Sequence, residues 1–272
     1  MNPDWFIPQW SAPPHVKAVF TSRAGGASLA PFDSLNLGDH VGDDPSHVAT
    51  NRQILQTQIA TKPVYLKQVH GVDVAHIDEK TPYGTAADAC ITTRKNLACT
   101  IMVADCLPVL FTDLEGRFVA AAHAGWRGLA NGVLNQSINS IIEEKTLLAD
   151  VLHRVLATEI IAWLGPCIGP HAFEVGSEVK AEFAANLPNS ASMFTPVSKS
   201  ASDGASGKCM ANLAGLARLN LQQLGVLPHH IFGNDGSAEW CTLSNPLRYF
   251  SHRRDAVSLG GSGRMAGCIW LD

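Results

Sequence analysis

Four apolar, strand-like segments follow one another between residues 86 and 123, and no helical pattern separates them. Their sequences are ADACITT, LACTIMVA, VLFTD and RFVAAAH, with a break at residues 105–108 before the third. Directly successive strands do not fit a regular β-α-β alternation, in which a helix connects parallel strands. The chain is therefore predicted to be an α+β protein with mixed β-sheets.

Helical periodicity is confined to segments that flank these strands. It predicts a helix within 43–60, a helix of about four turns that begins near residue 127, and helices over 173–187 and 210–225. Segments 248–254 and 264–271 resemble strands, whereas 189–207 is rich in Ser, Ala and Gly and is predicted to be a loop. Because no repeat or linker is evident, we predict a single domain over residues 1–272.

The composition favours a globular chain and argues against two classes of partner. With 272 residues, 46% of them hydrophobic, the chain is long enough to bury a large core. The net charge is −4 and no run of five like charges occurs, so we predict no nucleic-acid partner. No apolar segment reaches the roughly 18 residues that span a bilayer, and the first residues lack a secretion-signal pattern. We therefore expect a cytoplasmic protein with no membrane partner.

The seven cysteines do not resemble a disulfide framework. They are odd in number and scattered along the chain, so most are expected to be reduced thiols. A buried free cysteine packs as a small apolar residue, so chemistry has to be argued for each one separately.

Three residues stand out as candidates for chemistry, namely His70, Cys106 and His123. Each ends an apolar run and is followed within two residues by Gly or Pro, so three chain segments can deliver them to one point. Two imidazoles and a thiolate form a known catalytic zinc set with one open position. The spacing matches no short structural-zinc motif, so buried structural residues and a cysteine nucleophile with a histidine base remain alternatives.

Seven motifs carry a resemblance to a known family. They are KQVHG, ADCLPVLF, AAHAGWRG, GPCIGPHAFEVG, the pair CT at 241–242, FSHRRD and GRMAGCIWL. In this order, from about residue 17 to the C-terminus, they are similar to the YfiH-like laccase-domain family of bacterial proteins. The resemblance implies an αββα-type layered sandwich and a zinc ion bound by His70, Cys106 and His123.

The resemblance also implies purine nucleoside chemistry. Family members are described as phosphorylases of adenosine, inosine, guanosine and methylthioadenosine that also deaminate adenosine, and an older label is polyphenol oxidase. The expected partners are thus purine nucleosides and phosphate, with the chain acting as a monomer or homodimer. Zinc is the expected cofactor, and copper is able to occupy the same ligands in vitro.

Each of the two reactions needs further groups besides the metal. Deamination needs a carboxylate to move a proton, for which Asp105 is the candidate; its alternative role is to accept backbone N–H bonds in a turn. Phosphorolysis needs cations, and Arg127 lies at a predicted helix start where backbone N–H groups also favour an anion. We predict substrate contacts from seven more residues, namely Arg23, Asn36, Lys67, Gln68, Cys241, Thr242 and Arg253.

Three other functions compete with this interpretation. Cys106 with His123 or His70 as its base is also the pattern of a metal-free cysteine hydrolase. A copper-dependent phenol oxidase is less favoured, because multicopper oxidases use pairs of histidines in HxH motifs and this sequence contains none. A non-enzymatic role, as a metal-buffering or interaction protein, is the third.

Overall fold

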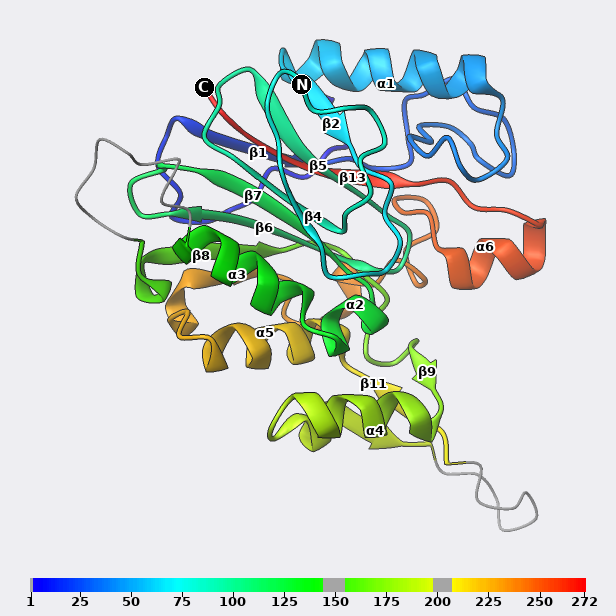
Figure 1. Cartoon of the computed structure of the whole chain (residues 1–272). Coiled ribbons are helices and arrows are strands. Elements are labelled where there is room, and N and C mark those ends of the chain that lie inside the picture. The colour runs from blue at the N-terminus through cyan, green and yellow to red at the C-terminus, as the bar shows by residue number, and fades with distance from the viewer. Residues whose placement is uncertain (1, 144–154, 198–206) are drawn as a thin grey trace.

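The computed structural model describes residues 2–143, 155–197 and 207–272. Two β-sheets lie face to face, and helices cover the outer face of each. Figure 1 shows α1 (Pro45–Ile59) on one side, and α3 (Val133–Glu143) and α5 (Leu213–Gln223) on the other. Side chains from both sheets interdigitate between them, among them Phe20, Ile101, Leu110 and Trp163. The predicted α+β class, with mixed sheets in an αββα sandwich, is confirmed.

The first sheet has four strands in the order β1-β13-β5-β2. Their bounds are β1 Val16–Phe20, β13 Met265–Leu271, β5 Leu97–Val103 and β2 Lys62–Tyr65. β2 runs parallel to β5, while the other two pairings are antiparallel. The predicted 43–60 helix is α1 (Pro45–Ile59), which Asp44 caps by accepting from the Ser46 N–H, and it packs on this sheet through Leu55 and Ile59.

The second sheet has six strands in the order β12-β8-β6-β7-β4-β3. Their bounds are β12 Ile231–Gly233, β8 Ile160–Leu164, β6 Leu107–Asp113, β7 Val119–Ala124, β4 Ala89–Thr92 and β3 Val74–His76. The two edge pairings are parallel and the central ones are antiparallel. The predicted break is shorter than expected, since β6 already begins at Leu107 and includes Pro108.

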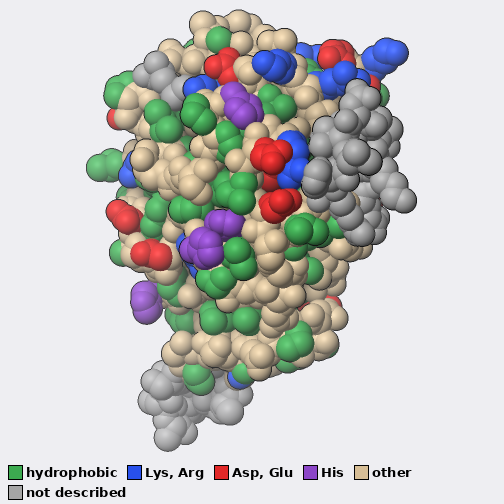
Figure 2. Space-filling view, turned by 90° about the vertical axis from the view of Figure 1, so that its left-hand side faces the viewer, with side chains coloured by type: hydrophobic (Ala, Val, Ile, Leu, Met, Phe, Trp, Pro, Cys, Tyr) green, Lys and Arg blue, Asp and Glu red, His purple; other side chains and the backbone are tan. Residues whose placement is uncertain are grey.

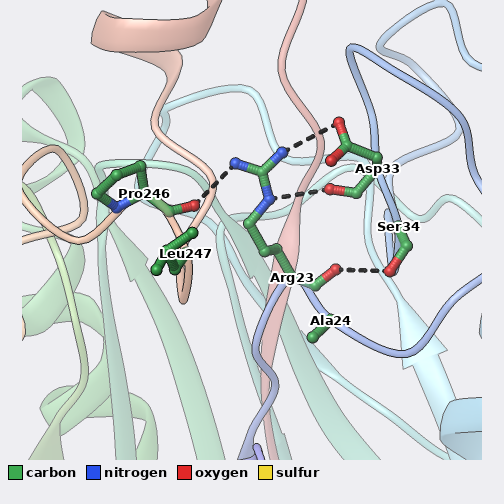
Figure 3. A pocket seen from close by; sticks show the side chains of 6 residues that line it. All are labelled: Arg23, Ala24, Asp33, Ser34, Pro246 and Leu247. Carbon is green, nitrogen blue, oxygen red and sulfur yellow. Dashed lines mark hydrogen bonds and ion pairs between the residues drawn. The ribbon is translucent and has the colours of Figure 1, made fainter.

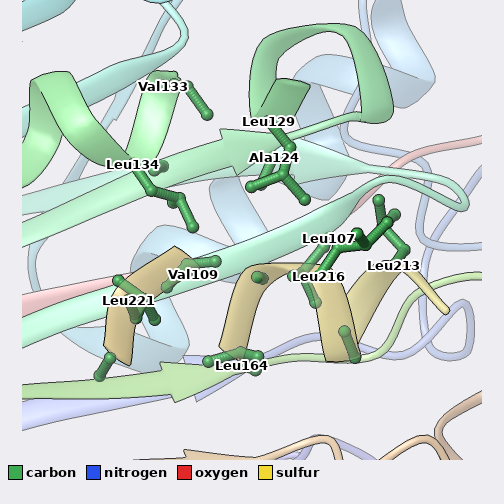
Figure 4. Packing of buried hydrophobic residues seen from close by; sticks show 14 of the residues in the cluster. Leu107, Val109, Ala124, Leu129, Val133, Leu134, Leu164, Leu213, Leu216 and Leu221 are labelled. Atoms are coloured by element: carbon green, nitrogen blue, oxygen red, sulfur yellow. The ribbon is translucent and has the colours of Figure 1, made fainter. Parts of the chain in front are cut away.

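A helical layer covers the outer face of the six-stranded sheet. It consists of α2 (Trp126–Ala130), α3 (Val133–Glu143) and α5 (Leu213–Gln223). Figure 4 shows leucines of these helices pointing toward β6 and β7. The helix predicted from residue 127 is therefore two helices, because the chain turns at Gly132, whose φ of 95° lies in the left-handed region.

A smaller sheet and α4 (Ser177–Asn186) extend from one end of the molecule (Figure 1). This sheet consists of β10 (Phe194–Pro196), β11 (Cys209–Ala211) and β9 (Glu174–Val175). The predicted 173–187 helix therefore starts only after a strand. The predicted 189–207 loop contains β10 and a short helix, and its residues 198–206 lie outside the described part.

Four 3₁₀ turns complete the elements of the described residues: η1 Ala157–Glu159, η2 Ser190–Met193, η3 Pro228–His230 and η4 Ala238–Trp240.

The prediction of a strand over 248–254 is wrong. Tyr249 and Phe250 are buried in a loop, and α6 (His252–Leu259) follows. Ser251 is the N-cap, since its hydroxyl accepts from the Arg254 N–H at 3.2 Å. The aromatic pair gives this segment the composition of a strand, whereas the cap decides its conformation.

Figure 2 shows basic and acidic side chains close together on one face, without a continuous basic area. Within the described residues, no helix combines the length and apolar character that a membrane span requires.

Candidate metal centre

His70, Cys106 and His123 come together, as predicted from the sequence. Cys106 directly precedes β6 and His123 lies in β7, and these strands pair so that Pro108 is opposite His123. His70 lies in the turn after β2 and has a φ of 60°. Thus two neighbouring strands position two of the side chains, and a turn from the other sheet brings the third.

The three side chains offer a compact set of donor atoms. Their candidate ligand atoms all lie within 4.8 Å of one another, and Nε2 of His70 is 3.8 Å from Sγ of Cys106. His70 is exposed, Cys106 is partly exposed and His123 is buried. A thiolate and two imidazoles, open to solvent on one side, fit a tetrahedral metal site with a free position.

Asp88 holds this arrangement and was not among the site residues predicted from the sequence. The carboxylate is fully buried and accepts from Nδ1 of His123 at 2.8 Å. It also accepts from the three successive backbone N–H groups of residues 69–71, at 2.7 to 3.0 Å. Asp88 therefore orients the His123 ring so that Nε2 faces the cluster, and it fixes the turn that carries His70. The signal in the sequence that could have identified Asp88 is an acidic residue directly before an apolar strand.

The charges of the cluster stabilise one another. Desolvation raises the pKa of the Cys106 thiol, but the charge and hydrogen bond of His123, and then those of His70, outweigh it and lower that pKa to about 6. Desolvation lowers the pKa of His123, but the Cys106 charge and the Asp88 hydrogen bond raise it to about 9. Desolvation also acts on Asp88, yet the bonds from His123 and the turn hold its pKa below the usual value. Without a metal, Cys106 and His123 form a thiolate–imidazolium pair near neutral pH.

Gly125 leaves the space in which the donor atoms converge. A Cβ atom built at this position would lie 2.9 Å from Cδ2 of His70 and 3.0 Å from Sγ of Cys106. Because Gly125 is also the N-cap of α2, the first helical turn approaches the cluster closely. Any side chain at residue 125 would compete with an ion for this space.

The carboxylate of Asp105 is engaged by three donors away from the ligand cluster. It accepts from the hydroxyls of Thr242 at 2.6 Å and Ser251 at 3.1 Å, and from the N–H of Arg253 at 2.7 Å. These contacts match the turn-forming role that was the alternative to proton transfer. Thr242, which was predicted to contact the substrate, is fully buried, and its hydroxyl is used in the bond to Asp105.

Arg23 lies in a separate cavity of about 300 Å³ that Figure 3 shows. Its guanidinium donates to the carbonyl and carboxylate of Asp33 and to the carbonyl of Pro246, and it stacks on the Phe250 ring at 4.6 Å. Arg23 therefore clamps two loops together.

Three other predicted substrate residues are held by hydrogen bonds within the protein. The Asn36 amide donates to the Gly38 carbonyl and to Asp43. The Gln68 side chain pairs with both backbone groups of Met102, at 2.8 Å each. The Cys241 sulfur is buried and accepts from the Gly169 N–H at 3.2 Å.

The remaining predicted residues, two for substrate binding and Arg127 for catalysis, are cations with exposed side chains. Lys67 lies three residues before His70. Arg127 stacks on the Trp126 ring at 4.5 Å in the first turn of α2. Arg253 is on α6, not on a strand end as predicted, and its guanidinium donates to the Glu174 carbonyl at 3.2 Å.

Arg264 is a second residue near the site that was not among those predicted from the sequence. Burial lowers the pKa of its guanidinium, while the charges of Cys106 and Asp105 oppose that shift. The guanidinium donates to the carbonyls of Ser262 and Gly263. Arg264 immediately precedes β13, whose Met265 pairs with Val103 of β5, so it is a cation close to the candidate centre.

Comparisons with known proteins show the family. Residues 17–272 match a family model described as multi-copper polyphenol oxidoreductase laccase. A Pseudomonas aeruginosa protein named purine nucleoside phosphorylase is 43% identical over 267 residues, covering 98% of both chains. The Escherichia coli protein named purine nucleoside phosphorylase YfiH is 41% identical, covering 97% of this chain and 98% of its own.

Solved structures share the fold. A Neisseria meningitidis protein of the DUF152 family is 41% identical with a TM-score of 0.86, and the match covers 99% of both chains. A Bacillus licheniformis YfiH protein is 28% identical with a TM-score of 0.83, covering 94% of this chain and 93% of its own. Taken together with the His-Cys-His cluster, these matches show that the chain belongs to the YfiH-like family described as multi-copper polyphenol oxidoreductase laccase.

Proposed function

We propose that this chain is a zinc-dependent purine nucleoside phosphorylase with adenosine deaminase activity. The substrates would be adenosine, inosine, guanosine and methylthioadenosine. The observation that carries the proposal is the cluster of His70, Cys106 and His123 in a chain that is similar over its whole length to proteins named purine nucleoside phosphorylase. We further propose that it acts in the cytoplasm as a monomer or homodimer.

The donor set supports zinc as the metal. One thiolate and two imidazoles suit a borderline-soft ion, and Asp88 leaves Nε2 of His123 available by holding Nδ1. Bound zinc would supply Lewis acidity at the open side of the cluster. Copper(II) also binds such ligands, so copper-loaded protein in vitro is expected. Within the described residues this is one three-ligand group, whereas multicopper oxidation of phenols needs several copper ions.

Phosphorolysis requires an anion beside the glycosidic bond. An oxygen of phosphate bonds to C1′ of the ribose while the C1′–N9 bond breaks and the purine leaves with the electron pair. We propose Arg127 first and Arg253 second as phosphate contacts, because both guanidiniums are exposed. The Arg127→Ala variant is expected to raise the apparent KM for phosphate by about tenfold, and an unchanged KM would remove Arg127 from the site.

Deamination requires a group that moves a proton to the departing amine. Asp105 is the proposed residue; in this role its carboxylate would exchange a contact with Thr242 or Ser251 for the substrate. Chromatography of adenosine incubated with and without phosphate separates the two reactions. Adenine that forms only with phosphate indicates phosphorolysis, whereas inosine that forms in both indicates deamination.

A metal-free cysteine hydrolase is the second candidate, and one observation favours it. Cys106, His123 and Asp88 have the order of a nucleophile, its base and an orienting carboxylate, with the pKa of the thiol at about 6. This function predicts that chelation leaves activity intact and that alkylation of metal-free protein abolishes it.

Metal analysis of the purified protein, followed by nucleoside assays on wild type and Cys106→Ala, tests the proposal. We expect about one zinc per chain and phosphate-dependent release of free base, both lost in the variant. Stoichiometric zinc without conversion of any nucleoside would refute the substrate assignment and leave the metal site standing. Loss of zinc without loss of any reaction would support a metal-buffering role.

A further inference from the structure

Arg264 is a partly buried cation that lacks an anionic partner. Within the described residues, other arginines form ion pairs with carboxylates, namely Arg23, Arg52, Arg117 and Arg254. The Arg264 guanidinium forms no ion pair in this part of the chain, although the residue is largely withdrawn from solvent. Burying a cation without an anion is costly, because the water that it loses is not replaced by an opposite charge. An anion from outside the chain would therefore be stabilised beside it.

One edge of this guanidinium is available to a ligand. Nη1 donates to the carbonyls of Ser262 at 2.9 Å and Gly263 at 3.0 Å. Nε and Nη2 have no hydrogen-bond partner within the described residues, and neither is among the unpaired atoms that are sealed from solvent. The N–H bonds of Nε and Nη2 run side by side along one edge of the group, as a fork that matches two oxygens of an oxyanion.

A continuous chain of hydrogen bonds leads from Arg264 to the candidate metal centre. The Ser262 carbonyl accepts from Arg264, and the Ser262 hydroxyl donates to Oδ2 of Asp255 at 3.2 Å. The same oxygen accepts from the N–H of the α6 N-cap, whose hydroxyl donates to Asp105 at 3.1 Å. In addition, β13 directly follows Arg264 and pairs with β5, the strand that leads to Asp105 and Cys106. The guanidinium therefore lies on the side of the centre that α6 borders.

The loop at residues 36–38 fixes the position of Arg264. Oδ1 of Asn36 accepts from the Arg264 N–H at 2.9 Å, and the Arg264 carbonyl accepts from the Leu37 N–H at 3.0 Å. The stem of the side chain lies against Gly38, where a Cβ atom would be 2.7 Å from Cγ of Arg264. Asn36, which was predicted to contact the substrate, thus holds the backbone of this arginine.

The negative groups whose charges act on Arg264 are Asp105 and Cys106, and both are engaged elsewhere. The Asp105 carboxylate accepts from two hydroxyls and a backbone N–H. Cys106 is one of the proposed metal ligands, so its charge would be shared with the ion. The positive charge of Arg264 is therefore left for an anion that enters the site.

We propose that Arg264 binds the phosphate used in phosphorolysis, through Nε and Nη2, beside the candidate metal centre. This inference rests on the proposed function, because phosphorolysis is the reaction that brings an oxyanion to this place. Arg264 is better suited to this role than the exposed Arg127 and Arg253, since a partly buried cation attracts an anion with less screening by water.

Calorimetric titration of inorganic phosphate into the zinc-loaded full chain, at fixed ionic strength, tests the inference. We expect saturable binding by the wild type with a dissociation constant of about 1 mM. Arg264→Gln removes the charge, and phosphate binding should weaken at least about tenfold. Arg264→Lys keeps the charge but not the fork, so its loss should be smaller, about threefold. The apparent KM for phosphate should rise in the same order.

Arg218→Lys is the matched control. Arg218 is also partly buried, but its Nε, Nη1 and Nη2 all donate to carbonyls of residues 231–234. This variant should bind phosphate like wild type. Circular dichroism and zinc content verify that each variant is folded.

The outcomes separate this inference from the proposed function. Phosphate that binds through Arg264 without cleavage of any nucleoside would sustain the inference and refute the function. Phosphorolysis with a wild-type KM for phosphate in both Arg264 variants would do the reverse. The inference is also overturned if the wild type binds no phosphate, or if binding is unchanged in both variants, which would assign the anion to the metal or to another cation.

Discussion

Asp88 and Asp105 are both buried acidic residues beside the His-Cys-His cluster, but the groups that donate to them differ. Asp88 accepts from a ligand ring, Nδ1 of His123, and from the turn that carries His70. Asp105 directly precedes Cys106 in sequence, yet its donors are two hydroxyls and the N–H of Arg253 in α6. The first carboxylate therefore orients the ligands, whereas the second joins the chain segments around them.

The comparison teaches that sequence proximity to a ligand is a poor guide to a role in the site. Asp105 adjoins Cys106 but points toward the N-terminus of α6. Asp88 is distant in sequence from all three ligands; it reaches His123 through the pairing of β4 with β7, and His70 through the backbone of the 69–71 turn. Four predictions test this division between the two regions.

The largest effect is expected on the protonation of Cys106, because Asp88 orients the His123 ring that lowers the pKa of this thiol. In metal-free protein the pKa of the thiol is about 6, compared with an ordinary value of 9.0, so the thiolate equilibrium shifts by about a thousandfold. Because the thiolate is the reactive form, alkylation should become fast as the pH rises through about 6. Absorbance at the thiolate band and alkylation rates against pH measure this. A midpoint near 9 would show that His123 does not pair with the thiol.

The next effect concerns Asp88→Asn. A carboxamide has one accepting atom fewer, so a backbone N–H of residues 69–71 or the His123 ring loses its acceptor. We expect metal affinity to fall by about 10- to 100-fold, and the free energy of unfolding to fall by about 3 kcal/mol. Competition with a chelator and urea unfolding measure the two quantities. Wild-type metal affinity in this variant would remove Asp88 from the site.

Gly125→Ala should have a smaller effect, confined to the metal. The new methyl group would occupy the space between His70 and Cys106, so affinity is expected to fall by about tenfold with little change in thermal stability. Gly71→Ala is the control, because its Cβ would meet the nearest atom, in Asp88, at 3.4 Å. Equal losses in both variants would mean that the conformation of the 69–71 turn, and not the space beside Gly125, limits metal affinity.

The smallest effect on the metal is expected for Asp105→Asn. Its donors lie outside the cluster, so metal affinity should change less than about threefold, while the free energy of unfolding falls by about 1 to 2 kcal/mol. The same variant tests proton transfer, since deamination should stop while phosphorolysis continues if Asp105 has that role. A metal affinity as weak as that of Asp88→Asn would abolish the distinction between the two carboxylates.

Much of the fold could be predicted because its pattern is local. The run of strands, α1 and the helical layer are encoded in apolar periodicity, and the three ligands each follow an apolar segment. The strand predicted over 248–254 failed, because the aromatic residues Tyr249 and Phe250 suggested a strand while the cap at Ser251 starts a helix. The four-turn helix from residue 127 failed at Gly132, where one backbone torsion divides it.

The support of the site could not be predicted, because it depends on contacts between distant segments. Asp88 gains its role only when β4 pairs with β7 and the 69–71 turn folds over it. Likewise, Arg23 resembles a phosphate ligand in sequence, but its donors are used by Asp33 and Pro246. His70, Cys106 and His123 could be identified as ligands from their residue types. The residue that orients them, Asp88, is determined by pairing between distant segments.

X-ray absorption spectroscopy at the zinc edge of the purified protein tests the central claim most directly. The account predicts about one zinc per chain, with one sulfur neighbour at about 2.3 Å and two imidazole nitrogens at about 2.0 to 2.1 Å. In Cys106→Ser the sulfur neighbour should disappear. A zinc ion surrounded only by oxygen and nitrogen in the wild type, or a sulfur neighbour that persists in the variant, would contradict the assignment of His70, Cys106 and His123 as the metal ligands.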